Sequence, residues 1–250
     1  MVNCLQCNDK VESVLFQGRL IKAIVCDACA EREQKSLEKE KHELDIRAAL
    51  SQSHIPYYHL EKLPVKPVEY QIAAQKFMDG LDKTGDKEEA FPYLWGPNGT
   101  GKTLLSIGLL KRLVIKHNGS ISVRYLKISE LARTSKYKLT EEIKSIGTGH
   151  YALLLDDLGN HNMFESTLEA LIDLIEIRLA SGKRTIVTSN YKPTKLVDRM
   201  VRDSSRNSAN INMCNAIMDR VLELCTPINI DGPSIRMKSA IERLGKIKNG

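Results

Sequence analysis

Residues 96–103 read Gly-Pro-Asn-Gly-Thr-Gly-Lys-Thr, which is the complete G-x-x-x-x-G-K-[ST] pattern of a phosphate-binding loop. Its glycines allow the backbone to curl, so that its N–H groups point at phosphate oxygens. The lysine is long enough to reach the β- and γ-phosphates of a nucleotide, and the last threonine can bind Mg²⁺. We therefore expect ATP or ADP to be bound by Gly96, Pro97, Asn98, Gly99, Thr100, Gly101, Lys102 and Thr103.

Further polar side chains follow apolar segments elsewhere in the chain. Residues 151–155 are a continuous apolar run, typical of a buried parallel strand, and they end at Asp156 and Asp157. Carboxylates at the carboxyl end of a strand lie where an open α/β sheet binds ligands. In this Walker B arrangement we expect Asp156 to hold Mg²⁺ and Asp157 to orient the attacking water. The β-branched segment 184–189 ends at Asn190, whose amide can hold that water, sense the γ-phosphate or simply form a turn.

A second kind of site lies near the N-terminus, where four of the six cysteines form two C-x₂-C pairs. Cys4 and Cys7 form the first pair, and Cys26 and Cys29 form the second. This spacing indicates a tetrahedral zinc site whose four thiolates leave no open position, so the zinc is structural. About thirty residues bury too little core to fold alone, so metal binding supplies the folding free energy. Balanced charges in residues 1–30 favour docking on a protein over binding DNA or RNA.

The elements that must position these groups follow from the rest of the pattern. The loop lies between an apolar segment, 91–95, and a Leu- and Ile-rich segment, 104–115, which predicts strand, loop and helix. The 250 residues suffice for one α/β domain with a small appendage. We expect a zinc-binding module in residues 1–30, a charged linker in residues 31–50 that is either a helix or a flexible spacer, and an ATPase domain in residues 51–250.

Composition restricts the cellular context. The formal net charge of +6 is compatible with nucleic acid but is no argument for it. The sequence has no apolar run of membrane-spanning length and does not start like a signal peptide. We therefore expect a cytoplasmic protein with reduced cysteines and no membrane partner.

The order of the motifs resembles a known family. The segments GPNGTGKT, LLLDDLG, IVTSN, AIMDRVLELC and GPSIRMK look like those of the DnaC/DnaI-type helicase loaders and the related IstB transposition ATPases, of the AAA+ class. The resemblance covers roughly residues 50–240, and the zinc module resembles the DnaI-type loaders in particular. It implies an α/β fold: a P-loop AAA+ parallel sheet flanked by helices, with a small N-terminal zinc-binding module.

The resemblance also implies residue roles. Asn190 matches the first sensor, Arg220 the arginine finger that reaches a neighbouring subunit's nucleotide, and Arg236 the second sensor of its own subunit. Without the resemblance, both arginines are typical of solvated surface residues. Two departures stand out: Asp157 replaces the usual Glu, and the polar stretch 202–212, which we expect to be a loop, lengthens the connection to Arg220.

Single-stranded DNA is a further ligand that the resemblance implies. The candidate segment runs from residue 127 to 149, where basic side chains surround one aromatic ring and could follow a phosphate backbone and stack a base. A solvated helix and loop explain the same composition equally well. The candidate contacts are Lys127, Arg133, Lys136, Tyr137 and Lys138.

Three functions are consistent with these residues. The first is an ATPase, slow and dependent on self-association of its AAA+ domains, that docks on a hexameric DnaB-type replicative helicase through the zinc module and places it on single-stranded DNA. The second is an IstB-like ATPase that regulates transposition on duplex DNA. The third is a zinc adaptor with a nucleotide switch but no catalysis. The zinc module favours the first, and the complete set of nucleotide motifs argues against the third.

Overall fold

The chain is described here by a computed structural model. It covers residues 2–4, 6–11, 14–16, 19–21, 25–60, 72, 79, 91–131, 136–160, 163–203, 208–238 and 240–241. Arg133 lies outside these residues.

The core of the molecule is a five-stranded parallel sheet in the order β6-β7-β8-β5-β9. Its strands are β5 (Phe91–Trp95), β6 (Val123–Lys127), β7 (Ala152–Leu158), β8 (Arg184–Ser189) and β9 (Cys225–Asn229). Leu153 and Leu155 of β7 face one apolar cluster while Leu154 faces another, so this strand is buried on both sides. Burial on both sides explains why the strand is a continuous apolar run.

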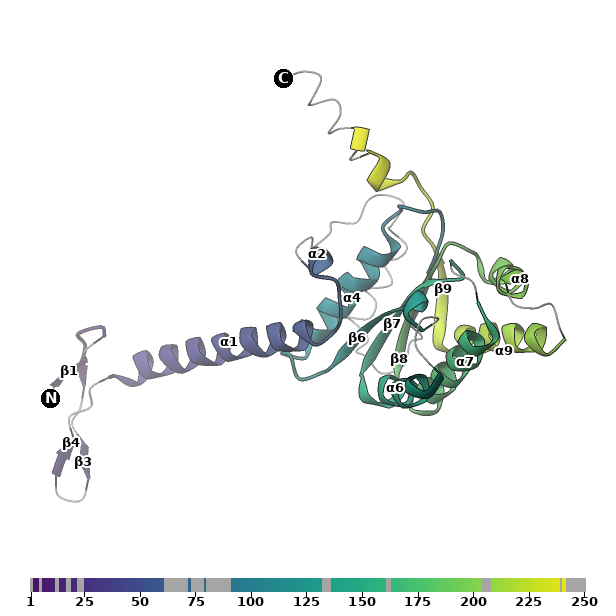
Figure 1. Cartoon of the computed structure of the whole chain (residues 1–250). Helices are drawn as coiled ribbons and strands as arrows, with labels where there is room; N and C mark the ends of the chain where they lie inside the picture. Colours follow the sequence, from purple (N-terminus) through teal and green to yellow (C-terminus); the bar gives the residue numbers. More distant parts are fainter. Residues whose placement is uncertain are drawn as a thin grey trace.

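Helices cover both faces of the sheet (Figure 1). One face packs mainly against α6, α7 and α9, and the other against α4 and the end of α1. The helices of this domain are α4 (Lys102–Lys116), α5 (Ile128–Leu131), α6 (Lys136–Gly149), α7 (Glu165–Ala180), α8 (Pro193–Asp203) and α9 (Ser208–Leu224). The expected α/β architecture with a parallel sheet flanked by helices is confirmed. No helix among the described residues has the length and apolar character needed to cross a bilayer.

The N-terminal part consists of two short antiparallel ribbons and a long helix. Its elements are β1 (Val2–Asn3), β2 (Lys10–Val11), β3 (Val14–Phe16), β4 (Arg19–Ile21), α1 (Asp27–Ser51) and α2 (Tyr57–Leu60). Helix α1 is continuous over the segment expected to be a linker, and it projects from the α/β domain with the ribbons at its far end (Figure 1).

The last turns of α1 are anchored on the α/β domain. Ile46, Ala49 and Leu50 pack against the cluster formed by α4 and the sheet, and Ile55 is buried in it. The turn that follows α1 also covers the exposed edge of β6, because the backbone carbonyl of Ser53 accepts a hydrogen bond from the Tyr125 N–H at 2.8 Å. An unpaired strand edge would otherwise be open to association with other strands.

One feature differs from the sequence-based expectation. The stretch 202–212 was expected to be a loop, but α8 continues to residue 203 and α9 begins at Ser208. Asn210 lies fully buried in α9, so tertiary packing overrides the low helix propensity of its Ser- and Asn-rich first turns.

The core also contains a fully buried arginine, Arg178 of α7. Its guanidinium lies near the amino ends of β7 and β8 and donates to Thr185 Oγ1 at 3.2 Å, to the His150 carbonyl at 2.8 Å and to the Arg184 carbonyl. Burial lowers the pKa of Arg178 to about 10. Its donors satisfy backbone carbonyls where α6 ends and two strands begin, which explains why a cation is tolerated in the core.

Candidate functional site

The phosphate-binding loop connects β5 to α4 at the carboxyl edge of the sheet. Gly96 has φ +146° and Gly99 has φ +85°, and a Cβ at either position would lie 2.1 Å from the segment after β9, against Ile230 O and Ser234 Oγ. Packing as well as backbone conformation therefore requires glycine at these two positions. Ser234 and its neighbours are held there by a hydrogen bond from the Ile235 N–H to the Gly99 carbonyl at 2.9 Å.

Lys102 is folded into this loop. Its ammonium donates to the carbonyls of Gly96 at 2.9 Å and Pro97 at 2.8 Å, and the side chain is almost fully buried. Burial lowers the pKa of Lys102 to about 8, which the nearby Asp157 and Asp156 carboxylates partly oppose. The carbonyls offer the Lys102 ammonium only partial negative charges, so a phosphate group with a full negative charge would be a stronger partner.

Asp156 is the buried carboxylate of the site, with only 3% of its surface exposed. Its Oδ1 accepts hydrogen bonds from Thr103 Oγ1 at 2.8 Å and Thr188 Oγ1 at 2.6 Å, and its Oδ2 accepts one from the Tyr125 hydroxyl at 2.9 Å. Burial and the charge of Asp156 raise the pKa of Tyr125, so that this hydroxyl stays protonated. The neighbouring hydroxyl and carboxylate of Thr103 and Asp156 fit the all-oxygen donor set that Mg²⁺ prefers.

Asp157 adopts a left-handed backbone conformation, with φ +63°. It lies where the register between β7 and β8 shifts, so that two successive side chains, Asp156 and Asp157, both face the site. Asp adopts this conformation more readily than Glu, because its short polar side chain can bond locally. The local geometry thus favours the residue that departs from the usual AAA+ pattern.

A chain of polar contacts surrounds the Asp157 carboxylate. Asn160 Nδ2 donates to Oδ1 at 2.8 Å, and Lys127 Nζ lies 3.4 Å from Oδ2. Asn190 Nδ2 in turn donates to Asn160 Oδ1 at 2.6 Å. Asn160 thus links Asn190 to Asp157. We expect Asn190 and Asp157 to bind and orient the attacking water.

These side chains share one pocket of about 800 Å³, within the range of small-ligand sites. The expected residues that line it are Asn98, Gly99, Gly101, Lys102, Thr103, Asp156, Asp157, Asn190 and Arg236. Of the other loop residues, Gly96 and Pro97 provide the carbonyls for Lys102, and Thr100 is buried with its hydroxyl bonded to the Pro97 carbonyl at 3.1 Å.

The pocket also has lining residues that were not predicted. These are Tyr58 and His59 of α2, Leu104, Tyr125, Asn160 and Ile235. Three of them lie close in sequence to expected residues: Leu104 follows Thr103, Ile235 precedes Arg236, and Asn160 is a polar residue three positions after Asp157. The places of Tyr58, His59 and Tyr125 depend on which strands and helices become neighbours.

Other expected residues lie elsewhere. Arg220 of α9 lies outside the lining of this pocket, and its guanidinium forms an ion pair with Glu223 at 2.9 Å on the surface. Lys127, expected to contact DNA, is among the residues that line this pocket. Lys136, Tyr137 and Lys138 belong to the first turn of α6, but their side chains are outside the described part of the structure.

The four N-terminal cysteines form a compact cluster whose Sγ atoms all lie within 4.8 Å of one another. Cys4 and Cys29 are buried, and Cys7 Sγ lies 3.5 Å from Cys26 Sγ. Backbone N–H groups, of which that of Cys7 has the largest effect, lower the pKa of Cys4 to about 6 and favour its thiolate. Four converging sulfurs on two C-x₂-C turns fit a tetrahedral zinc ion.

The parallel sheet, the phosphate-binding loop before α4 and the paired carboxylates after β7 define a P-loop nucleotide-binding protein of the AAA+ class. Residues 18–243 match the family of IstB-like ATP binding proteins, and the chain belongs to that family.

Two curated relatives are named for ATP binding and for insertion sequences. One, of insertion sequence IS232 from Bacillus thuringiensis subsp. berliner, is 27% identical over 157 residues, which are 61% of this chain and 58% of that protein. The chain thus spans less than two thirds of that relative. The other, from Mycobacterium tuberculosis, is 25% identical over 225 residues and covers 86% of this chain and 80% of that protein.

Solved structures with the same fold include replication proteins. The crystal structure of DnaI is 25% identical with a TM-score of 0.56, over 72% of this chain and 94% of that chain. The DnaC helicase loader is 19% identical with a TM-score of 0.54, over 70% and 99% respectively, which supports the fold alone.

Proposed function

We propose that this protein hydrolyses ATP and uses the reaction to load a hexameric replicative helicase onto single-stranded DNA in the cytoplasm. The observation that carries the catalytic part is the single pocket that contains Lys102, both carboxylates after β7, Asn190 and Arg236. In this proposal residues 1–30 dock on the helicase, α1 carries them, and the remaining residues form the ATPase domain.

The pocket residues divide the chemistry among them. Lys102 and the loop N–H groups bind the phosphates, and Arg236 neutralises charge from the side of the segment after β9. Mg²⁺, held by Thr103 and Asp156, would neutralise the charge that develops on the phosphate oxygens. Asp157 accepts a hydrogen bond from the attacking water and orients it, while Asn160 holds the Asp157 carboxylate in place.

Two substitutions test the catalytic part. Lys102→Ala removes the main cation of the phosphate site, so binding of a fluorescent ATP analogue should be lost. Asp157→Asn keeps a residue that tolerates the left-handed backbone, so binding should persist while phosphate release falls. An unchanged ATP affinity in Lys102→Ala would show that the loop assignment is wrong. Equal phosphate release by Asp157→Asn and the wild type would refute the role of Asp157. ATP binding without phosphate release by the wild type would instead favour the adaptor with a nucleotide switch.

The position of Arg220 supports a role between subunits. It is separated from its own pocket and partly exposed on α9, where a neighbouring subunit could reach it. A guanidinium supplied by one subunit to the nucleotide of the next makes hydrolysis depend on assembly. The ATPase domains therefore self-associate in this proposal.

The loader role rests on the N-terminal part and on the likeness to DnaI. The cysteine cluster lies at the far end of a helix of 25 residues, away from the ATPase pocket (Figure 1). A module in this position is accessible to a second protein and suited to bind it. The full-length chain should retain a purified DnaB-type hexamer in a pull-down, and Cys26→Ser, which removes one zinc ligand, should not. Retention of the hexamer by both chains would argue against docking through the module.

A second candidate is a regulator of transposition, favoured by the insertion-sequence names of both curated relatives. In that case the full-length protein should co-purify with a transposase and assemble on duplex DNA with ATP, without retaining the helicase hexamer. The two pull-downs, performed side by side, separate the candidates.

A further inference from the structure

Tyr125 forms two hydrogen bonds to different parts of the molecule, one through its side-chain hydroxyl and one through its backbone N–H. Its hydroxyl donates to Asp156 Oδ2 at 2.9 Å, and its backbone N–H donates to the Ser53 carbonyl at 2.8 Å. Asp156 belongs to the nucleotide pocket, whereas Ser53 lies in the turn that directly follows α1. One residue of the edge strand β6 therefore contacts both the pocket carboxylate and the anchor of the N-terminal helix.

In the pocket, the Tyr125 hydroxyl is one of three donors that hold the Asp156 carboxylate in place. Thr103 and Thr188 both donate to Oδ1, whereas Tyr125 donates to Oδ2. The three donors come from α4, β8 and β6, and together they fix the plane of the carboxylate. Tyr125 is 5% exposed and Asp156 is 3% exposed, so bulk water is poorly placed to replace a lost donor.

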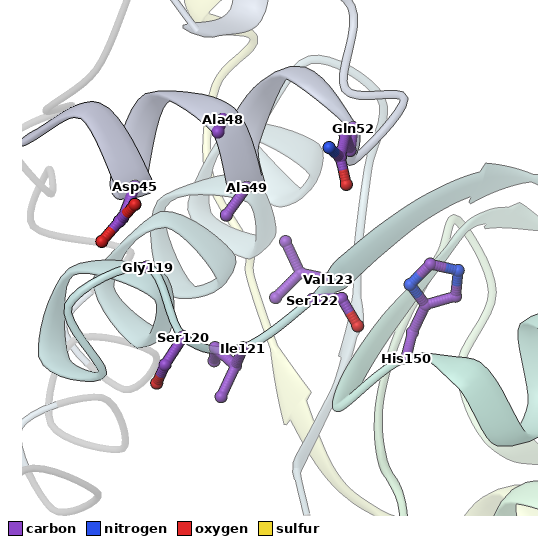
Figure 2. Close-up of a pocket in the computed structure, with 10 residues that line it drawn as sticks. All are labelled: Asp45, Ala48, Ala49, Gln52, Gly119, Ser120, Ile121, Ser122, Val123 and His150. Carbon is purple, nitrogen blue, oxygen red and sulfur yellow. The ribbon is translucent and has the colours of Figure 1, made fainter. Parts of the chain in front are cut away.

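At its backbone N–H, Tyr125 contacts the turn after α1, and this end of α1 packs closely on the α/β domain. Ser53 is fully buried, and Ile55 shares an apolar cluster with Tyr125. Gly119, in the loop after α4, approaches α1 so closely that a Cβ there would lie 2.4 Å from the Asp45 carbonyl carbon. Figure 2 shows Gly119 beside Asp45 and the rest of this end of α1, around a hollow of about 290 Å³.

We propose that Tyr125 is a positioning residue that sets Asp156 for Mg²⁺ and links this carboxylate to the anchor of α1. The inference rests on the proposed function, because it assumes that the pocket binds Mg²⁺ together with ATP. Groups that orient a metal ligand typically change metal affinity by about 10- to 100-fold when they are removed. Through this contact the N-terminal part can influence how well the pocket holds its metal.

The chain offers a matched control for the hydroxyl. Tyr93 is also a buried tyrosine of the same sheet, on β5, but its hydroxyl donates to the Tyr191 carbonyl at 2.6 Å and does not reach Asp156. Tyr93→Phe therefore also removes a buried hydroxyl of the sheet, but without touching the pocket carboxylate. Any effect confined to Tyr125→Phe belongs to the contact with Asp156.

The experiment measures binding of a fluorescent ATP analogue to the full-length chain, in EDTA and over a series of Mg²⁺ concentrations. Tyr125→Phe should raise the Mg²⁺ midpoint about 10-fold or more, with the affinity in EDTA unchanged. Tyr93→Phe should match the wild type in both. An unchanged midpoint in Tyr125→Phe, or an equal shift in both variants, overturns the proposal. Failure of the wild type to bind the analogue would refute the proposed function itself.

A second pair of variants tests the link to α1 in the same assay. Gly119→Ala forces α1 away from the domain, whereas Gly182→Ala places the same residue at a positive φ, +58°, with nothing within 4 Å. Both carry similar backbone strain, so their difference reports the clash with α1. Gly119→Ala should raise the Mg²⁺ midpoint and Gly182→Ala should not. Equal midpoints in the two, with both chains folded by circular dichroism, would refute the link.

Discussion

Arg220 and Arg236 are expected to act on different nucleotides, and mixtures of inactive variants test this directly. Arg236 lines the pocket of its own subunit, while Arg220 lies outside it, paired with Glu223. With 42% and 47% of the two side chains exposed, the pair is worth about 0–1 kcal/mol. The free energy needed to break the Arg220–Glu223 pair is therefore small compared with the effect of an arginine finger, which increases the hydrolysis rate by roughly 10³–10⁵.

The activity recovered by mixing two inactive variants depends on which residues each ATPase site takes from which subunit. A working site takes Lys102 and Arg236 from one subunit and Arg220 from the next. In an equal mixture of Arg220→Ala and Lys102→Ala chains, random assembly gives about one complete site in four. The mixture should therefore reach about a quarter of wild-type turnover, although each variant alone is nearly inactive.

The same reasoning predicts one mixture that fails and another that succeeds. Arg236→Ala mixed with Lys102→Ala should stay inactive, because both residues must come from the same chain. Arg236→Ala mixed with Arg220→Ala should again give about a quarter of wild-type turnover.

Steady-state phosphate release is measured over all mixing ratios and should peak at equal amounts. Sedimentation with ATP confirms that the variants co-assemble. Absence of rescue in co-assembled Arg220→Ala and Lys102→Ala chains would refute a site completed by a neighbour. Rescue of the Arg236→Ala and Lys102→Ala mixture would show that Arg236 does not act within its own subunit.

Three further outcomes are expected. Arg178→Met leaves the partly buried carbonyls of His150 and Arg184 without this donor, so urea unfolding should show a loss of about 2–6 kcal/mol, and a loss below about 1 kcal/mol would contradict the assigned role. Asn160→Ala removes the link between Asn190 and Asp157, so turnover should fall by up to about 100-fold at constant ATP affinity, and an affinity change of the same size would contradict a positioning role. Elemental analysis should find one zinc per chain, released by chelators; Cys26→Ser should lose the zinc but keep ATP binding, and absence of metal from protein made with ample zinc would contradict the site.

The nucleotide pocket was largely predictable because its parts are local in sequence. The phosphate-binding loop carries its own strand and helix, and the apolar run before Asp156 is buried on both faces as expected. Parallel strands bring their carboxyl ends to one edge, so Asn190 could be placed beside the loop without knowledge of the strand order.

The remaining residues depend on contacts that the sequence does not encode locally. Tyr125 and Lys127 reach the carboxylates only because β6 pairs with β7, and strand order is invisible in either segment. The place of Lys127 in the pocket could therefore not be predicted from the basic segment to which it belongs. Tyr58 joins the pocket only through the turn that returns from α1. The backbone of Asp157 is likewise set by the register shift between two strands.

Helix α1 has a mechanical consequence. Its 25 residues span about 37 Å, and residues 30–45 are exposed, so most of its length is a rod supported at one end. A tilt of about 5° at the anchor near Gly119, where α1 contacts it through Asp45, would move the cysteine cluster by roughly 2 Å. The geometry of α1 therefore amplifies displacement: a small tilt at the anchored end moves the cysteine cluster at the other end farther than any residue near the anchor.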